Sequence, residues 1–291
     1  MLQVLLNSHR FAGANGRRLR VDGEYGPQTR FAVAAAGRAT GIAGDGETAP
    51  IALLRQLLTD VDLQVVSSVD IADARLQADV DVLTSNYDDP ILLGGMCNGL
   101  AQMVQEVRSR GRPGKVALLR FDGHGNLGEW LTVSVGNVAH IRRGDAAEKQ
   151  EYARIEQETN SYISAQNFNR VSGAIQPLRS VFAPFGFAEH RGCTLGARPQ
   201  TRAMLQRLAD LWNVPIRVGI QRQTIGLALE ISGPAFTAYP RGRNLHTWSE
   251  QFQLLDLPGA SQAPRASAAS TRTPPSISHP DLVSPGSHRP E

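Results

Sequence analysis

The chain has 291 residues, of which 41% are hydrophobic and 20% are charged, and this composition is typical of a folded globular protein. Its 30 basic and 27 acidic residues give a formal net charge of +3, too small to indicate binding to nucleic acid or to an anionic membrane. Two cysteines, Cys97 and Cys193, exclude a disulfide-rich scaffold and lack the Cys-x-x-Cys spacing of structural zinc. At least one thiol is therefore available for chemistry.

No segment approaches the ~18 consecutive apolar residues of a membrane helix. Residues 1–7 lack the basic head, apolar stretch and cleavage site of a secretory signal. Among the basic residues only Lys115 and Lys149 are lysines, a bias that fits high-GC bacterial coding. We therefore expect no membrane span and synthesis in the bacterial cytoplasm without a Sec signal. Export by a specialised secretion system to the periplasm or a target cell is a further hypothesis.

Residues 1–60 predict a small all-α domain of three helices, because apolar residues recur there at helical spacing and glycine-bearing polar turns separate them. The expected helices begin at Leu2 and cover 30–38 and 51–58. Between the first two, Asp22-Gly23 predicts a tight turn, Gly26 an unusual backbone conformation, and Pro27 the start of the next helix.

This turn resembles the peptidoglycan-binding domain of bacterial cell-wall enzymes. The resemblance implies a glycan-binding motif and peptidoglycan as a partner; the motif residues are Asp22, Gly23, Tyr25, Gly26, Pro27 and Thr29. Ala36-Gly37 stand where that family carries a Phe-Gln pair, which weakens the expectation of binding. The alternative is a module that serves only for docking or packing.

Residues 61–255 predict an α/β domain with a mostly parallel sheet covered by helices on both faces. The expected strands cover 79–85, 115–121, 131–135, 187–192, 216–220 and 228–231, and the expected helices 98–108, 171–182 and 199–212. A charged stretch over 145–159 predicts a solvated helix or a mobile insertion, and whether the polar insertion 144–164 blocks a site is left open. Residues 256–291, rich in Pro, Ser, Ala and Thr, predict a disordered tail.

Two of the expected strands end in a glycine-flanked reactive residue. Phe121-Asp-Gly-His124-Gly125 ends one, and Glu189-His-Arg-Gly192-Cys193 ends the other. Ligand sites in such sheets lie beyond the carboxyl ends of the strands, and a thiol beside an imidazole supplies a nucleophile and its base. Asp122 lies two residues before His124 and is a candidate for the carboxylate that orients it, whereas His190 is expected to pack.

This pairing resembles the caspase-like family of cysteine peptidases, which includes the gingipain, legumain and separase relatives. The resemblance implies peptide-bond hydrolysis with His124 as the catalytic histidine, Cys193 as the nucleophile, and the N–H groups of Gly125 and Cys193 as oxyanion donors. It implies no metal and no organic cofactor. The chain lacks the Gln-Ala-Cys-Arg-Gly run of the caspases proper, so their preference for aspartate is not carried over. The substrate expected is a protein or the stem peptide of peptidoglycan.

Three alternatives stay open. Cys97, before an amphipathic helix, followed by His124 or His140, has the Cys-then-His order of papain-like cell-wall amidases. A zinc site from His124, His190 and Cys193 has poor strand geometry. A non-catalytic peptidoglycan-associated binding or effector module would keep the cavity without the chemistry.

Overall fold

The computed structural model describes residues 1–86, 88–94, 99–125, 128–136, 144–157, 160–226 and 231–260. In these ranges the helices are α1 Leu2–Ser8, α2 Pro27–Thr40, α3 Ile51–Asp60, α4 Gln77–Ser85, α5 Gly99–Arg110, α6 Ala146–Gln157, α7 Phe168–Ile175, α8 Pro199–Trp212 and α9 Leu245–Ser249. The strands are β1 Gln64–Asp70, β2 Ile91–Leu93, β3 Val116–Asp122, β4 Trp130–Thr132, β5 Tyr162–Ser164, β6 Phe182–His190, β7 Ile216–Gly219 and β8 Ala235–Ala238.

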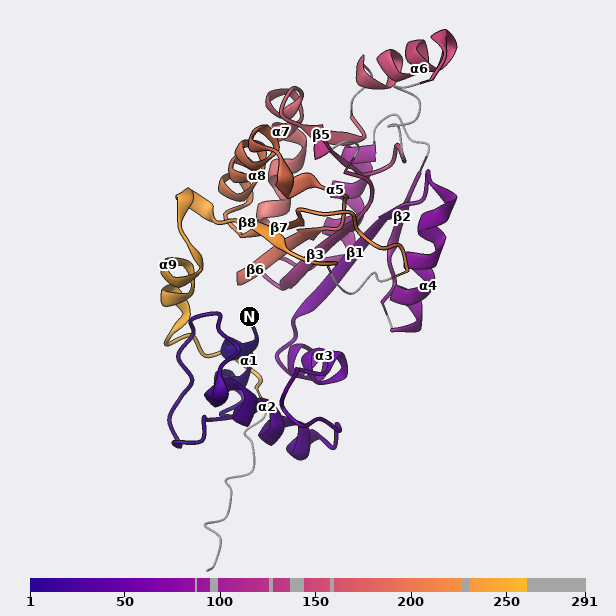
Figure 1. Ribbon diagram of the computed structural model, residues 1–291. Coiled ribbons are helices and arrows are strands. Elements are labelled where there is room, and N and C mark those ends of the chain that lie inside the picture. Colours follow the sequence, from indigo (N-terminus) through magenta and orange to yellow (C-terminus); the bar gives the residue numbers. More distant parts are fainter. Residues whose placement is uncertain are drawn as a thin grey trace, which may run out of the picture.

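Six of these strands form one mostly parallel sheet in the order β2-β1-β3-β6-β7-β8, in which only the β7–β8 pairing is antiparallel. Strands β4 and β5 form a separate antiparallel pair. The expectation of an α/β architecture with a mostly parallel sheet is therefore confirmed. Figure 1 shows α1–α3 at one end of the molecule and α6 at the opposite end, with the sheet between them.

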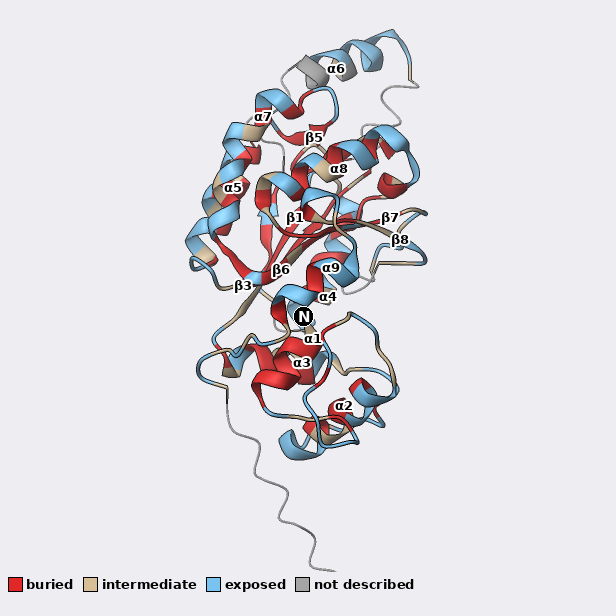
Figure 2. Cartoon of the chain, turned by 90° about the vertical axis from the view of Figure 1, so that its left-hand side faces the viewer, coloured by how far each residue is buried: buried red, intermediate tan, exposed pale blue. Residues whose placement is uncertain are grey.

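The two faces of the sheet are covered differently. On one face, apolar side chains of the strands, such as Leu119 and Phe121, join α5, α7 and α8 in the main core. On the other face Val69 packs against Leu76, Val80 and Leu83 of the α4 region. Figure 2 shows the strands of the sheet largely buried, while α5 and α8 expose residues on their outer sides. In such sheets the loops beyond the carboxyl ends of the strands carry the ligand sites.

The N-terminal helices share a hydrophobic core with the end of the described chain. Trp248 of α9 and Phe252, in the short helix η7 Glu250–Phe252, join the buried apolar residues of α1–α3. Ala117 of β3 and Phe185 of β6 belong to the same cluster. The chain therefore returns from the sheet to its own N-terminal module, and the two parts are joined by one continuous apolar core.

Three details correct the sequence prediction. The segment 79–85, expected as a strand because Asp-Val-Asp-Val alternates, belongs to helix α4, since Val80 and Leu83 share a buried face three residues apart. The expected helix over 171–182 ends earlier, and β6 begins at Phe182. Strands β1 and β2 were not predicted; Ser67 and Ser68 interrupt the apolar run of β1.

Packing against the N-terminal helices also extends beyond residue 255, where the tail was expected to begin. Residues 256–260 were assigned to the tail, yet the Asp256 carboxylate pairs with Arg18 at 2.8 Å and the Leu257 amide donates to the Ser8 hydroxyl. Ala260 contacts the same apolar core. The expected strand over 228–231 falls largely outside the described residues, as does the rest of the expected tail.

Trp248→Ala should lower the free energy of unfolding by about 3 kcal/mol, because it empties a buried position in the core shared by the two parts. Leu254→Ala, in the same segment but 87% exposed, is the matched control and should change it by less than about 0.5 kcal/mol. Urea unfolding measures both, followed by far-ultraviolet circular dichroism because the variant loses a tryptophan. Equal effects would show that α9 does not hold the module in place.

Candidate active site

His124 and Cys193 lie beyond the carboxyl ends of two neighbouring parallel strands. The register of β3 and β6 pairs Phe121 with His190. His124 lies three residues after Phe121, and Cys193 lies three residues after His190. Both line one cavity of about 290 Å³, whose walls also include Asp79, Arg191, Arg222, Gln223 and Thr224. The topology therefore brings together the two residues that the sequence singles out as histidine and nucleophile.

The backbones of the two strand ends approach so closely that only glycine fits between them. A Cβ on Gly125 would lie 2.9 Å from the Cys193 nitrogen, and one on Gly192 would lie 2.8 Å from the Gly125 nitrogen. Neither the Gly125 amide nor the Cys193 amide has a hydrogen-bond acceptor among the described residues. These two amides therefore lie beside each other at the strand ends, without a partner among the described residues.

A carboxylate that the sequence analysis did not identify orients the histidine. Nε2 of His124 lies 2.9 Å from Oδ2 of Asp73, and both side chains are largely buried. Asp73 follows β1 and caps the short helix η1 Ala74–Leu76 by accepting the Arg75 amide. Hydrogen bonding to Arg75 is the main reason why the pKa of Asp73 lies well below its usual range, so this carboxylate is charged.

Two opposing effects set the charge of His124. Burial lowers the pKa of the ring, while the neighbouring Asp73 carboxylate raises it, and the net direction is downward from the ordinary value of 6.5. His124 is therefore neutral near pH 7. With Nε2–H donated to Asp73, Nδ1 is the ring nitrogen that can take up a proton.

Asp122 has a different role from the one expected. Its Oδ1 is hydrogen-bonded to Nη1 of the buried Arg191, which also lies 3.4 Å from Oδ1 of Asp79. Asp122 therefore does not orient His124 directly, because the carboxylate on that ring is Asp73. Burial raises the pKa of Asp122 to about 6, against the attraction of Arg191.

The same buried cluster holds the loop that follows β7. Nη2 of Arg191 donates to the Thr224 carbonyl at 3.0 Å, and Asp79 accepts the Gly226 amide at 2.7 Å. One step earlier in this loop, the Gln223 amide donates to Sγ of Cys193 at 3.3 Å. The cluster thus fixes the segment that forms one wall of the cavity and touches the sulfur.

His190 is an interior residue and not a second base. Its Nδ1 accepts the Gly192 amide at 2.9 Å, and its Nε2 faces the Thr132 carbonyl at 3.2 Å. Burial lowers the pKa of His190 to about 4, so the ring is neutral. The part of the chain that the structure describes contains no group of three His, Cys, Asp or Glu residues that could hold a metal ion.

The peptidoglycan-type motif bends at Asp22-Gly23 as expected, with Gly23 at a φ of +79°. The unusual conformation predicted for Gly26 is wrong, because its φ of −84° and ψ of −178° are those of extended backbone that any residue adopts. Several polar groups of the motif are used within the module. The Gln3 side chain accepts the amides of Asp22 and Gly23 and donates to the Asp22 carboxylate and the Thr29 hydroxyl. The Tyr25 hydroxyl donates to the Gly46 carbonyl.

Around these internal bonds, the surface of the motif is partly covered. The position of Gly23 is closed by the Leu245 side chain of α9, which a Cβ would approach to 2.6 Å. A cavity of about 270 Å³ beside the turn includes Gly26, Pro27 and Thr29 in its lining.

Two alternative catalytic residues, Cys97 and His140, lie outside the described residues. In the ranges the structure describes, no helix has the length and apolar character needed to span a membrane. No protein-family model matches the chain, and searches of curated proteins and of solved structures found no match either.

Asp73→Asn should lower the pKa of His124 further, because it removes the charge that opposes the effect of burial. Histidine-selective NMR titration of the variant and the wild type measures this, with the resonance assigned by its loss in His124→Ala. An unchanged or higher pKa would show that Asp73 does not orient the ring in solution.

The free energy of unfolding should fall less steeply in Asp122→Asn than in the wild type as the pH rises from 4 to 6. A carboxyl group whose pKa is raised from about 3.9 unfolded to about 6 folded stabilises the fold at low pH, and this contribution of about 3 kcal/mol is lost as pH rises through that window. Asp70, whose pKa is also raised to about 6, has the same sign and is retained.

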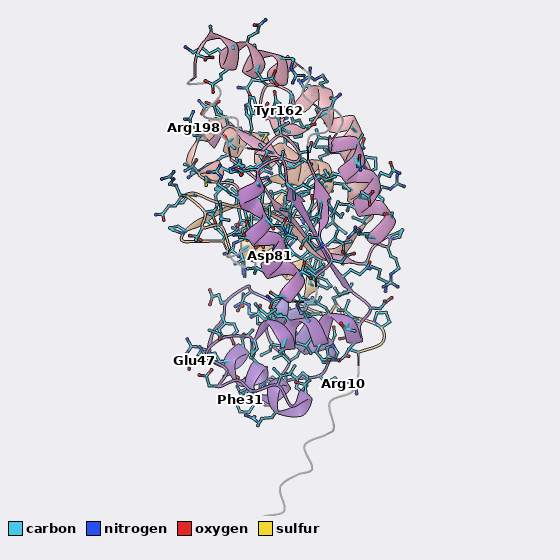
Figure 3. The ribbon with its side chains drawn as sticks, turned by 90° about the vertical axis from the view of Figure 1, so that its right-hand side faces the viewer. Arg10, Phe31, Glu47, Asp81, Tyr162 and Arg198 are labelled. Carbon is cyan, nitrogen blue, oxygen red and sulfur yellow. The ribbon has the colours of Figure 1, made fainter. Side chains whose placement is uncertain are left out.

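Urea unfolding at several pH values compares Asp122→Asn with Asp81→Asn, an exposed carboxylate on α4 that Figure 3 labels. The control should keep the wild-type slope of stability against pH. A wild-type slope in Asp122→Asn would mean that this carboxyl group titrates normally in the folded protein.

Proposed function

We propose that the protein is a cysteine-dependent hydrolase of peptide bonds, of the caspase-like kind, in which His124 and Cys193 form the dyad and Asp73 orients the histidine. One observation carries the proposal: His124 and Cys193, from neighbouring parallel strands, line the same cavity. This is the placement that the resemblance implies, with the histidine after one central strand and the cysteine after the next. The Asp73 contact supplies the third group of a nucleophile, base and orienter arrangement.

In the proposed mechanism, Sγ of Cys193 attacks the carbonyl carbon of the scissile bond and its proton passes to Nδ1 of His124. The negative charge on the former carbonyl oxygen is stabilised by the Gly125 and Cys193 amides. The C–N bond then breaks as His124 protonates the leaving amine, which leaves a thioester on Cys193. Water, deprotonated by His124, hydrolyses the thioester and restores the thiol. The balance requires no metal and no redox partner.

The residues of the proposed site are buried to different degrees, and each degree of burial suits the role proposed for the residue. Asp73 and His124 are largely covered, so their attraction is weakly screened once the ring takes up a proton during the reaction. Cys193 is only partly buried and lines the cavity, so a substrate can reach the sulfur. Arg222 is exposed at the same cavity, at a position where it can contact the substrate chain.

The proposal assigns substrate targeting to the N-terminal module only as a secondary hypothesis. Internal hydrogen bonds from Gln3 and contact with Leu245 support a packing role for the motif. Binding of peptidoglycan is therefore tested separately from cleavage, by co-sedimentation of the inactive Cys193→Ala protein with purified peptidoglycan.

Cys193→Ala and His124→Ala should each lower the rate of peptide hydrolysis at least about 1,000-fold, because each removes a member of one catalytic unit. The assay uses a mixed peptide library and purified peptidoglycan, and its products distinguish a protein substrate from a stem peptide. Cys97→Ala is the matched control and should cleave as the wild type does.

Two results would contradict the proposal. Loss of cleavage only in Cys97→Ala would move the nucleophile to the papain-like alternative. Absence of cleavage by every form, with binding to peptidoglycan retained by Cys193→Ala, would support the non-catalytic module.

A further inference from the structure

Asp70 is a buried carboxylate near the proposed site that has no part in the proposed chemistry. It is the last residue of β1 and is 1% exposed. Its Oδ2 accepts the Gly136 amide at 2.8 Å and its Oδ1 accepts the Ala72 amide at 3.2 Å. The Thr132 hydroxyl and the Val135 amide also lower the pKa of this carboxylate, against the effect of burial. Asp70 thus joins two segments that are more than 60 residues apart.

The first of these segments carries the group that orients the histidine ring. The Asp70–Ala72 hydrogen bond closes the turn after β1, and Asp73, the next residue, contacts Nε2 of His124. Gly136 is pressed against this turn, since a Cβ there would lie 3.1 Å from the Ala72 carbon and 3.2 Å from the Asp73 nitrogen. The position of Asp73 therefore depends on how the 132–136 segment is held.

The second segment holds the backbone of the same histidine. The Thr132 hydroxyl accepts the His124 amide at 2.6 Å, and the Thr132 amide donates to the His124 carbonyl at 3.1 Å. Thr132 is 1% exposed, so these bonds have no competition from bulk water. The Thr132 hydroxyl also favours the ionised form of Asp70, and a hydroxyl hydrogen directed at that carboxylate leaves the lone pairs of the oxygen for the His124 amide.

We propose that Asp70 is a positioning residue for His124: it fixes Asp73, which holds the ring, relative to Thr132, which holds the backbone. The inference rests on the proposed function, because it concerns how the His124–Cys193 dyad is aligned. Asp70 contacts neither reacting side chain in the described structure, so it acts through these two segments.

Asp70→Asn replaces one acceptor oxygen by an NH2 group, which then faces a backbone N–H. We expect alkylation of Cys193 by iodoacetamide at pH 7.5 to slow about tenfold, kcat for peptide cleavage to fall by a similar factor, and KM to stay within about twofold. The His124 ring resonance in NMR should shift as well. Asp81→Asn, an exposed carboxylate on α4, should match the wild type in all these measurements.

Thr132 variants test the same connection with less risk to folding. Thr132→Val removes the hydroxyl and should act like Asp70→Asn, whereas Thr132→Ser retains the hydroxyl and should keep most of the activity. The double variant Asp70→Asn/Thr132→Val should be little slower than either single variant, because both act on one connection. If Asp70→Asn does not fold, the contrast between the two Thr132 variants decides the question.

The outcomes separate this inference from the proposed function. Equal alkylation rates for the wild type and His124→Ala would contradict the dyad itself. A His124-dependent rate that is unchanged in Asp70→Asn and in Thr132→Val would leave the dyad intact and overturn the positioning role of Asp70. Additive losses in the double variant would also overturn it, since independent structural damage behaves in that way.

Discussion

The proposed site depends on the parallel pairing of β3 with β6. The register sets Phe121 opposite His190, and the segments that follow the two strands leave the sheet next to each other. Their backbones approach so closely at Gly125 and Gly192 that a side chain at either position would displace the other strand end. This approach brings the amides and the reactive residues of the two strands to one cavity. A shift of one residue in the pairing would send each side chain to the opposite face and separate them.

Around this edge, buried charges hold the loops in place. Arg191 is shared between Asp122 and Asp79 and binds the loop that contacts the sulfur of Cys193. A buried charge destabilises the fold unless it is paired and hydrogen-bonded, so removing one partner leaves an uncompensated charge that lowers the free energy of unfolding. Asp70 likewise connects two segments, since it accepts the amides of Ala72 and Gly136. Hydrogen bonds from buried charged side chains therefore hold the loops around the site, in addition to the packing of the apolar core.

Much of this arrangement could be predicted from the sequence, and the misses have clear causes. The apolar run that forms β3, and Pro199 at the start of α8, are strong local signals, and both elements were predicted. Strand β1 was missed because Ser67 and Ser68 interrupt its apolar pattern, although both are buried in the sheet. Because that strand was missed, nothing indicated that the residues after it reach the histidine.

The assignment of individual carboxylates shows the same limit. Asp122 is a candidate for the orienting group because it is close to His124 in sequence, while Asp73 lies 51 residues away and makes the actual contact. Only the strand order, in which β1 lies next to β3, brings Asp73 to the ring. A local pattern can identify a reactive residue, but its partner is determined by the topology.

The central claim is that Cys193 becomes covalently attached to the substrate during hydrolysis. Rapid acid quenching of the protein with a cleaved peptide or ester, followed by mass spectrometry, measures this directly. We predict an added mass equal to the acyl part of the substrate, mapped to Cys193. An adduct on Cys97, or product formation with no adduct on any cysteine, would contradict it.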